Sequence, residues 1–501
     1  MPVFDSGQVS DAAASNAKRL SILQVMAGNA ASTPTPMRAR LAWLRTFRSE
    51  IAAEASHLAR LMHREIDKPE EEALSGDIMA LLAACTWLER NAARYLRPRR
   101  VGGRALWQLG QKHSITRAPL GTVGIIATWN YPVQLLGIQL MQALVAGNRV
   151  IVKPSEHVPD TQARLLELAS KAGLSEGTLR WTEATREAGG RMLEEHDLDH
   201  LVFTGSTGVG RIIAGELARK LTPSTLELSG RDSAFVLADA DPELAAAAVW
   251  NGVTMNAGQT CMAPRRALVD ARVYPRFLKA LAPLASGARP RALITPFAAE
   301  TCFSLASGAI AAGGRSLSGV AEPPTNRTLR PLAIVDCPRD APLVAGDHFG
   351  PVIAVVPTRS IDDALAIHRS CDQHLATSIY TRNRRSARTL AERLGASNVT
   401  INDTILPTAH PATPIGGHGA SGWGLSYGVD GLLQMTRPVV VSTTSSRIRI
   451  PLHRPAEPRR LLQAIGFLYG RSRTPSSTPD DAANAPSPER PSVLGSATTT
   501  P

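Results

Sequence analysis

The chain has few aromatic residues, few cysteines and no long apolar run. Aromatic side chains make up 4% of its 501 residues, and the lysines and arginines behind its formal net charge of +12 are scattered rather than interleaved with aromatics. Such a charge distribution supports only non-specific attraction to nucleic acid, so we expect no nucleic-acid partner. No apolar run approaches the roughly 20 residues that a membrane-spanning helix needs, and we find no signal peptide.

The five cysteines are odd in number and widely spaced, and none lies in a CxxC or Cys/His pattern. Disulfides and structural zinc are therefore not expected, and a reducing cytoplasm fits best. We interpret four of them as packing residues: Cys85, Cys302, Cys337 and Cys371. A chain of this length, 44% apolar, is long enough for two or three domains with substantial cores.

The apolar spacing predicts long amphipathic helices over 37–97 and then an alternation of strands and helices. Expected strands are 122–127, 149–153, 200–203, 266–269, 332–336, 352–356 and 399–402. Expected helices are 160–172 and 206–221. Such alternation favours a doubly wound parallel sheet followed by a second α/β region. An extended hairpin is expected over 104–117, and the late β-prone run 439–442 pairs either with it or with another subunit.

Two segments carry residue types that suit thiol chemistry on a carbonyl group. Cys261 closes the loop 256–261, and Glu227 lies 261 − 227 = 34 residues earlier, at the end of an apolar strand. A thiol beside backbone N–H groups in a polar loop can be held partly as thiolate, the form that attacks carbonyl carbon. A carboxylate facing a pocket has a pKa raised by desolvation and can take a proton from water. The plain alternatives are an inert buried cysteine and a surface carboxylate.

Three further blocks follow predicted strands. In Thr128-Trp129-Asn130-Tyr131-Pro132, the Asn130 amide can donate to a developing oxyanion, the alternative being a turn asparagine. Lys153-Pro154-Ser155-Glu156 ends a strand, and Gly205-Ser206 lies between a strand and a helix whose N-terminus suits a pyrophosphate. A lone Gly/Ser turn of this kind is a weak signal, since it is not the usual GxGxxG pattern.

In this order, the motifs from about Arg38 to Ser442 resemble the NAD(P)-dependent aldehyde dehydrogenase superfamily, and their details are closest to its class 3 branch. The resemblance implies that Cys261 forms a thiohemiacetal, that Asn130 and the Cys261 N–H hold the oxyanion, and that Glu227 activates water. It assigns cofactor binding to Trp129, Lys153, Ser155, Glu156, Gly205, Ser206, Asp347 and Phe349. Tyr131, Leu135 and Met262 are expected to form apolar walls that favour a hydrophobic aldehyde.

The resemblance implies NAD or NADP as cofactor. NAD is preferred, because Glu156 would repel a 2′-phosphate. The chain departs from the family pattern at Ser229 and Arg231, where Gly and Lys are usual, and at Asp347, where Glu is usual. If the first glycine served a positive φ or a close cofactor approach, Ser229 would hinder it, and the shorter Asp347 would loosen the contact with the nicotinamide ribose.

The implied fold is α/β, with a Rossmann-like cofactor domain, a second α/β catalytic domain and a small oligomerisation hairpin that makes a homodimer. The expected boundaries are a leader 1–36, a cofactor domain 37–100 and 120–228, a catalytic domain 229–425, oligomerisation segments 101–119 and 436–446, an extension 447–470, and a disordered tail 471–501. The extension is basic and apolar, so it either docks on the enzyme body or rests peripherally on an anionic membrane.

Two rival functions stay open. A coenzyme A-acylating dehydrogenase would use the same thiol and cofactor but would not need Glu227 as a water-activating base. A non-catalytic family member that acts as a binding or scaffold protein is suggested by the departures at Ser229, Arg231 and Asp347. Function has to be argued from the site rather than from the fold, and the chemical residues of the site favour hydrolytic aldehyde oxidation.

Overall fold

A computed structural model describes residues 35–103, 108, 110–444 and 457–470. The chain divides into one unit of Met1–Arg100 with Ser114–Val441 and a second unit of Val101–His113 with Ser442–Pro501. The expected disordered tail 471–501, most of the leader and the start of the C-terminal extension lie outside the described residues.

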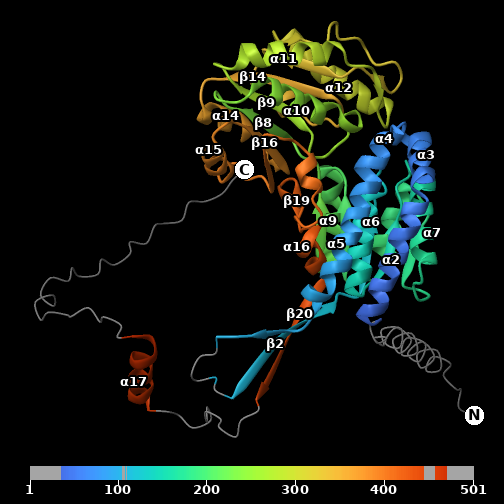
Figure 1. Cartoon of the computed structure of the whole chain (residues 1–501), viewed down its shortest axis with the longest axis vertical. Coiled ribbons are helices and arrows are strands. Elements are labelled where there is room, and N and C mark those ends of the chain that lie inside the picture. Colours follow the sequence, from blue (N-terminus) through green and yellow to red (C-terminus); the bar gives the residue numbers. More distant parts are fainter. Residues whose placement is uncertain (1–34, 104–107, 109, 445–456, 471–501) are drawn as a thin grey trace, which may run out of the picture. The chain divides into compact units, whose positions relative to one another are not determined.

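Helices at the start of the first unit confirm the periodicity over 37–97. They are α2 (Met37–Ala53), α3 (Ala55–Ile66), α4 (Glu70–Glu72), a π-helical turn η1 (Ala73–Ile78) and α5 (Met79–Leu96). The helices α2 and α5 and the turn η1 pack on α6 (Gln134–Ala146), which is buried along its whole length. Figure 1 shows α2, α5 and α6 side by side. The π-helical turn is not foreseen by a 3.6-residue pattern, and it lies beside the candidate site.

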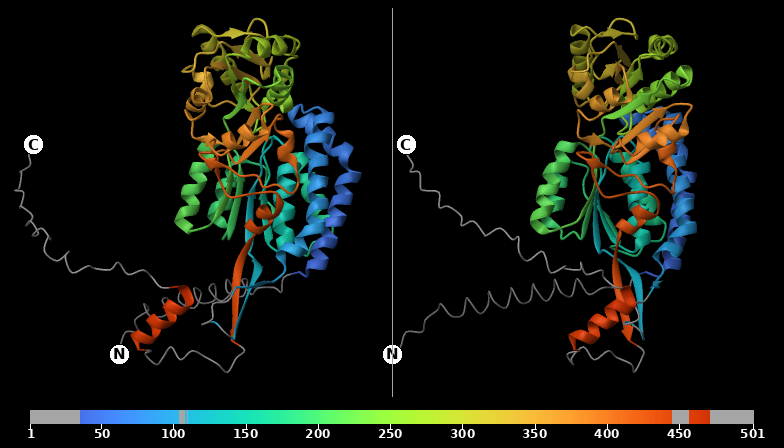
Figure 2. Two further views of the ribbon diagram at one scale, coloured as in Figure 1. Left: turned by 60° about the vertical axis from the view of Figure 1, so that its left-hand side comes forward. Right: turned by 90° about the vertical axis from the view of Figure 1, so that its left-hand side faces the viewer.

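A six-stranded sheet forms the centre of the first α/β region. Its strands run in the order β19-β7-β6-β3-β4-β5, and all are parallel except β19. They are β3 (Thr122–Ile126), β4 (Arg149–Lys153), β5 (Leu179–Trp181), β6 (His200–Thr204), β7 (Ser224–Glu227) and β19 (Gly422–Trp423). The helices α2, α5, α6 and α7 (Pro159–Lys171) cover one face, and α8 (Arg186–Glu195) and α9 (Thr207–Lys220) cover the other. Figure 2 shows the sheet between these layers.

A seven-stranded sheet forms the second α/β region, in the order β11-β13-β14-β9-β8-β16-β17. Its strands are β8 (Asp232–Val236), β9 (Pro264–Asp270), β11 (Arg315–Ser316), β13 (Leu332–Val335), β14 (Val352–Thr358), β16 (Ala376–Tyr380) and β17 (Asn398–Ile401). Along β14, Val352, Ala354 and Val356 enter one apolar cluster while Ile353 and Val355 enter the opposite one. This alternation buries both faces of the sheet, as a parallel sheet requires.

Helices cover both faces of this second sheet. One face packs on α10 (Pro242–Thr254) and α11 (Tyr274–Ser286). The other packs on α12 (Pro296–Ala311), α13 (Pro342–Ala345), α14 (Ile361–His368) and α15 (Arg384–Ala391). Shorter elements complete the unit: the 3-10 turns η3 (Met255–Gly258) and η4 (Leu406–Ala409), the strands β10 (Arg291–Ala292), β12 (Thr328–Leu329), β15 (Gln373–His374) and β18 (His418–Gly419), and α16 (Gly428–Gln434).

A three-stranded sheet, in the order β1-β2-β20, contains the boundary between the two units. Its strands are β1 (Arg99–Val101), β2 (Gln111–Pro119) and β20 (Thr436–Thr444). The late β-prone run therefore pairs with the earlier extended segment, which is one of the two alternatives left open by the sequence. The second unit also contains α17 (Pro458–Tyr469), on which Leu462, Ile465 and Phe467 are exposed. In the described part of the chain, no helix combines the length and apolarity that crossing a membrane requires.

Most expected elements are confirmed within one or two residues, including β4, β6, β9, β14, β17, α7 and α9. The sequence analysis missed β8 and β16, which lie at the centre of the second sheet. Both strands are short and buried along their length. β8 begins with Asp232 and Ser233, and β16 contains Thr377 and Ser378, so neither segment forms an apolar run or a clear alternation from which a strand could be predicted.

Candidate active site

A cavity of about 210 Å³ in the first unit contains the two residues that the sequence singled out for chemistry. Cys261 and Glu227 both line it, and so do the three expected wall residues Tyr131, Leu135 and Met262. The remaining lining is mostly apolar: Gly76, Ala80, Met255, Ile405, Leu406, Ala409, Ile415 and Tyr427, with Lys68, Glu72, Ser75, Gln134, Asn256, Thr260 and Thr408 as the polar members. Residues far apart in sequence thus form one mostly apolar pocket with a few convergent polar groups, the usual character of a ligand site.

The loop before Cys261 has an uncommon backbone. Asn256, Ala257 and Gly258 all adopt positive φ values, of 51°, 55° and 72°. A Cβ atom on Gly258 would lie 2.4 Å from the carbonyl carbon of Gly350, so glycine is required there for close packing as well as for conformation. Consecutive residues in the left-handed conformation raise the free energy of the folded chain, and they persist only where the surrounding structure holds them. This conformation turns the chain from α10 into the pocket and presents Cys261 at its wall.

The Cys261 thiol is more basic than the sequence suggested. Burial, with the nearby carboxyl groups of Glu227 and Asp232, raises the pKa of Cys261 to about 12, although Arg265 opposes the shift. The raised pKa contradicts the expectation that the thiol is held partly as thiolate. The loop that was expected to be polar is buried, and desolvation disfavours the charged form. In this state the thiol has to lose its proton as it attacks.

Glu227 ends β7, as expected, and its side chain is buried at the cavity wall. Its carboxylate accepts hydrogen bonds from the hydroxyls of Ser426 and, at 3.5 Å, Thr204. Burial raises the pKa of Glu227 to about 7, against the lowering effect of those two hydrogen bonds. The expected rise through desolvation is confirmed, and the group can gain or lose a proton near neutral pH.

Asn130 lies at the start of the turn between β3 and α6, where it joins the nucleophile loop. Its Nδ2 donates to the carbonyl of Gln259 at 3.1 Å, and its Oδ1 accepts from the Thr128 hydroxyl. An amide nitrogen carries two hydrogens, so Nδ2 retains a second donor. Next to it, the Tyr131 hydroxyl lies 2.8 Å from Thr260 Oγ1, one residue before Cys261.

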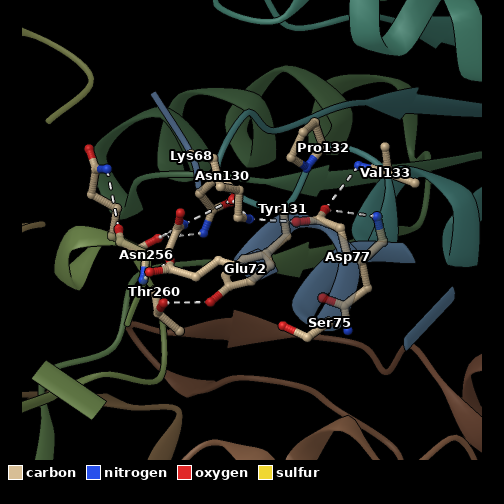
Figure 3. A network of polar contacts seen from close by, with 12 residues as sticks. Lys68, Glu72, Ser75, Asp77, Asn130, Tyr131, Pro132, Val133, Asn256 and Thr260 are labelled. Atoms are coloured by element: carbon tan, nitrogen blue, oxygen red, sulfur yellow. Dashed lines mark hydrogen bonds and ion pairs between the residues drawn. The ribbon is translucent and has the colours of Figure 1, made fainter. Parts of the chain in front are cut away.

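A buried ion pair that the sequence analysis missed supports this turn. Lys68 Nζ lies 2.5 Å from Asp77 Oδ2, donates to the carbonyl oxygen of Asn130 at 2.9 Å, and sits 3.9 Å from the centre of the Tyr131 ring. Asp77 Oδ1 accepts from the backbone N–H groups that begin α6 at Val133 and Gln134. Figure 3 shows this network reaching from the π-helical turn to Asn256 and Thr260. A charged aspartate within an apolar helical stretch is the signal that would have revealed it.

The expected cofactor residues gather at the carboxyl edge of the six-stranded sheet. The register aligns Ile126 of β3 with Lys153 of β4 and with Phe203 of β6. Lys153 Nζ bonds the Glu156 carboxylate at 2.6 Å, and Ser155 is buried, with its N–H bonded to Gln162. Carboxyl edges of parallel strands are where dinucleotides bind.

Two features of this edge fit a dinucleotide. Ser206 caps the N-terminus of α9 and is exposed, with exposed Val209 and Ile212 on the following turns. A helix N-terminus suits a phosphate, and exposed apolar side chains suit a flat base. Gly205 packs on the Phe203 ring, from which a Cβ atom would lie 2.4 Å away, so glycine is needed there.

The second group of cofactor candidates comes from both α/β regions. The rings of Trp129 and Phe349 meet edge to face with centroids 5.8 Å apart. Asp347 is exposed two residues before Phe349. Ser229 does not adopt a positive φ, so the backbone strain considered for the missing glycine is absent. It is Gly230 that needs to be small, because a Cβ there would lie 2.8 Å from the carbonyl oxygen of Cys261.

Two cavity residues missed by the sequence analysis have strained backbones. Ile405 and Tyr427 adopt φ values of 53° and 63°, and both line the cavity. A β-branched residue at positive φ is a genuine outlier. Because the surrounding structure has to hold these two backbones in place, it also fixes the positions of the two side chains in the cavity wall. Cys85, Cys302, Cys337 and Cys371 are buried free thiols away from the cavity lining, in agreement with their interpretation as packing residues.

Comparisons with known proteins agree with this architecture. The family model described as "Aldehyde dehydrogenase family" matches residues 5–441. The chain is 29% identical to a 4,4'-diapolycopene aldehyde oxidase of Methylomonas sp, over 82% of this chain and 79% of that protein. It is 31% identical to aldehyde dehydrogenase family 3 member B2 of Mus musculus, over 78% and 82% of the two chains. Among solved structures, an NAD+ complex of aldehyde dehydrogenase from Bacillus cereus matches with a TM-score of 0.77 at 25% identity, covering 83% and 86% of the chains.

Proposed function

The chain belongs to the aldehyde dehydrogenase family of NAD(P)-dependent oxidoreductases, and from that premise we propose that it oxidises a hydrophobic aldehyde to the carboxylic acid through a thiohemiacetal and a thioester on Cys261. The observation that carries the proposal is the shared cavity, in which the Cys261 thiol and the buried Glu227 carboxyl group face the same apolar space. A nucleophile and a base with a pKa of about 7 are the pair that acyl transfer to water requires.

The steps follow from the chemistry of these side chains. The Cys261 sulfur bonds to the aldehyde carbon and the thiol proton passes to solvent, while Asn130 Nδ2 and the Cys261 N–H donate to the oxygen as its negative charge develops. NAD(P), when bound, would accept a hydride from this carbon, and loss of that hydride would convert the thiohemiacetal into a thioester on Cys261. Glu227 then removes a proton from water, whose oxygen attacks the thioester. The C–S bond then breaks, the carboxylic acid leaves with the water oxygen, and the sulfur takes the proton back from Glu227.

Residues at the strand edge would hold the cofactor. Lys153 and Glu156 would bond the adenosine ribose, and Ser206 with the N-terminus of α9 would receive the pyrophosphate. Trp129, Ser155, Gly205, Asp347 and Phe349 complete the proposed set. The Glu156 carboxylate supports a preference for NAD, since it would repel a 2′-phosphate, whereas NADP is the weaker cofactor. Titrating both cofactors by quenching of protein fluorescence tests this, and tighter NADP binding would contradict it.

The cavity supports a hydrophobic aldehyde as substrate. Leu135 and Met262, with Ile405 and Ile415, present apolar side chains around the thiol. Burial of apolar substrate area contributes about 25 cal/mol per Å², so longer alkyl or aromatic aldehydes should show lower KM than acetaldehyde-sized ones. A panel of short, long-chain and aromatic aldehydes ranks them, and a preference for the shortest and most polar members would contradict the proposal.

Turnover is tested by following absorbance of the reduced cofactor with NAD and then NADP, with Cys261→Ser as the matched control. We expect formation of reduced cofactor that disappears in the variant, while cofactor binding stays nearly unchanged. Wild-type turnover in Cys261→Ser would defeat the assignment, and silence of both proteins across the panel would favour a non-catalytic family member. Adding coenzyme A and finding acyl-thioester product in place of acid would favour the acylating alternative, which Glu227 argues against.

The finer assembly and location are also proposals. We assign residues 37–100 and 120–228 to cofactor binding, 229–425 to catalysis, and the segments 101–119 and 436–446 to a homodimer. The edge position and exposure of β20 support the last assignment. Light scattering tests it, and a monomer would remove the inference.

Five free thiols support a reducing cytoplasm as the working compartment. The exposed apolar side chains of α17, beside Arg459 and Arg460, support a peripheral contact with an anionic membrane. Liposome flotation of the full chain and of a chain ending before Arg459 tests this contact. If flotation is absent, or is unchanged by the truncation, the membrane contact is ruled out.

A further inference from the structure

Arg265 is a buried arginine four residues after the proposed nucleophile, and nothing in the proposed reaction yet uses it. It lies at the start of β9, with 3% of its surface exposed. Within the described residues no carboxylate lies at ion-pair distance from its guanidinium, although the chain's other ion pairs are numerous. A buried charge without a counter-ion is costly, so its retention calls for an explanation.

The guanidinium hydrogen-bonds carbonyl groups on both sides of the site. Nη1 donates to the carbonyls of Gly258 and Gly350, each at 2.9 Å, and Nη2 donates to the carbonyl of Thr260 at 2.8 Å. Its carbon atom lies 5.4 Å from the centre of the Phe349 ring. One side chain thus ties the nucleophile loop to the segment that carries Phe349.

The contact with Thr260 bears directly on the nucleophile. The Thr260 carbonyl and the Cys261 N–H belong to one planar trans peptide unit, so fixing the oxygen fixes the opposite direction of the N–H. The carbonyl in between, that of Gln259, is held by Nδ2 of Asn130 and by Nδ2 of Asn256. The carbonyls of the three residues before Cys261 therefore all accept hydrogen bonds from side chains. Arg265 donates to the first and the third of these carbonyls.

We propose that Arg265 is a positioning residue, which aims the Cys261 N–H at the oxyanion position and supplies the positive charge against which the thiolate forms. The inference rests on the proposed function, in which that N–H is an oxyanion donor. A donor fixed before the reaction stabilises the developing charge without reorganisation. The absence of a directly bonded carboxylate fits this role, because an anion paired with Arg265 would weaken the charge beside the thiolate. Asp232 and Asp347 act on the guanidinium from nearby, without an ion pair in the described residues.

The test compares Arg265→Gln, which removes the charge, with Arg265→Lys, which keeps it but loses the planar fork that spans separate carbonyls. The matched control is Arg272→Gln. Arg272 lies two residues after the end of β9, is paired with Asp270 and is largely exposed. The first readout is the rate of Cys261 alkylation by iodoacetamide across pH, followed on the Cys261 peptide by mass spectrometry. The second is aldehyde turnover, and thermal unfolding checks the fold.

We expect Arg265→Gln to slow Cys261 alkylation about tenfold at a given pH, which corresponds to a rise of about one unit in the pKa of the Cys261 thiol. We also expect kcat to fall about a hundredfold or more. Arg265→Lys should keep the alkylation profile near wild type while kcat stays low, and Arg272→Gln should change neither. A purely structural residue would not separate the two readouts in this way.

Wild-type alkylation and turnover in a folded Arg265→Gln protein would overturn the inference. If that variant does not fold, Arg265→Lys decides: an alkylation profile shifted to higher pH, or wild-type kcat, overturns it. Alkylation needs no substrate and is independent of turnover. Failure of the proposed function would instead appear as a fully active Cys261→Ser enzyme.

Discussion

Glu227 and Asp77 are two buried carboxyl groups near the nucleophile loop, and they differ in their hydrogen-bonding and charged partners. Asp77 is paired with the Lys68 ammonium at 2.5 Å and also accepts two backbone N–H groups. Glu227 is bonded to the hydroxyls of Ser426 and Thr204, and no lysine or arginine in the described chain forms an ion pair with it. Only the second carboxyl group lines the cavity.

The difference separates a structural carboxylate from a chemical one. A cation and two N–H donors stabilise the charge of Asp77, so that it can hold the Asn130 turn and the start of α6 in one place. Glu227 lacks a counter-ion, and its pKa rises to about 7 through burial. Burial is common to both groups. Without a cationic partner, Glu227 can exchange its proton near neutral pH.

The largest expected effect comes from Glu227→Gln, which removes the base but keeps the shape. We expect steady-state turnover to fall about a hundredfold to ten-thousandfold, because the thioester would still form but its hydrolysis would become slow. A rapid burst of reduced cofactor, close to one per active site, should remain. Stopped-flow absorbance measures it, with Cys261→Ser as the variant that shows no burst. Unchanged steady-state turnover would remove Glu227 from the mechanism.

Breaking the structural pair should chiefly cost stability. Lys68→Met leaves the buried Asp77 charge alone, and we expect the free energy of unfolding to fall by about 3–5 kcal/mol. Denaturant titration measures the change. The half-exposed pair of Arg48 with Glu89 is the control, where Arg48→Met should cost about 1 kcal/mol or less.

A double variant sharpens this result. Lys68→Met with Asp77→Leu removes both charges, so most of the lost stability should return. The carbonyl of Asn130 would still lack the Lys68 donor, and kcat should remain below wild type although the protein is stable. Full recovery of kcat in the double variant would show that the pair does not position the Asn130 turn.

The pH dependence of thioester hydrolysis reports on Glu227 itself. Below a pH of about 7 the carboxyl group is protonated and cannot accept a proton from water, so the hydrolysis rate should fall about tenfold per unit as the pH decreases. Above that pH the rate should level off. Single-turnover decay of the thioester measures this limb, which should be missing in Glu227→Gln. A limb that persists in the variant would belong to another group.

The smallest expected effect is a shift of that limb in Ser426→Ala. The Ser426 hydroxyl donates to the Glu227 carboxylate and lowers its pKa. Without this bond the pKa should rise further, and the limb should move to higher pH by about one unit. Ser421→Ala is the control, because its hydroxyl donates to the carbonyl of Ser229 instead. A shift to lower pH would contradict the assigned direction.

Local patterns in the sequence were sufficient to find the helices over 37–97, α7 and α9, several strands, the family, and the two candidate chemical residues, but not α6 or the helices α10 to α15 around the second sheet. β4 at 149–153 and α9 after Ser206 follow from apolar spacing and capping, which act over a few residues. Glu227 and Cys261 were identified because each ends a recognisable motif. The thiol's protonation was predicted wrongly, because loop polarity does not reveal burial beside two carboxyl groups.

The sequence by itself thus determined the α/β order and the family, and it singled out the proposed nucleophile, the proposed base and the carboxyl edge proposed for a dinucleotide. Only the tertiary structure decided which buried charges meet. Lys68 and Asp77 come together with Asn130, 62 residues from Lys68, and Ser426 meets Glu227 across 199 residues. The strength of a charge depends on its solvent exposure and on its nearest partners. Both are properties of the packed chain, and no sequence spacing encodes them.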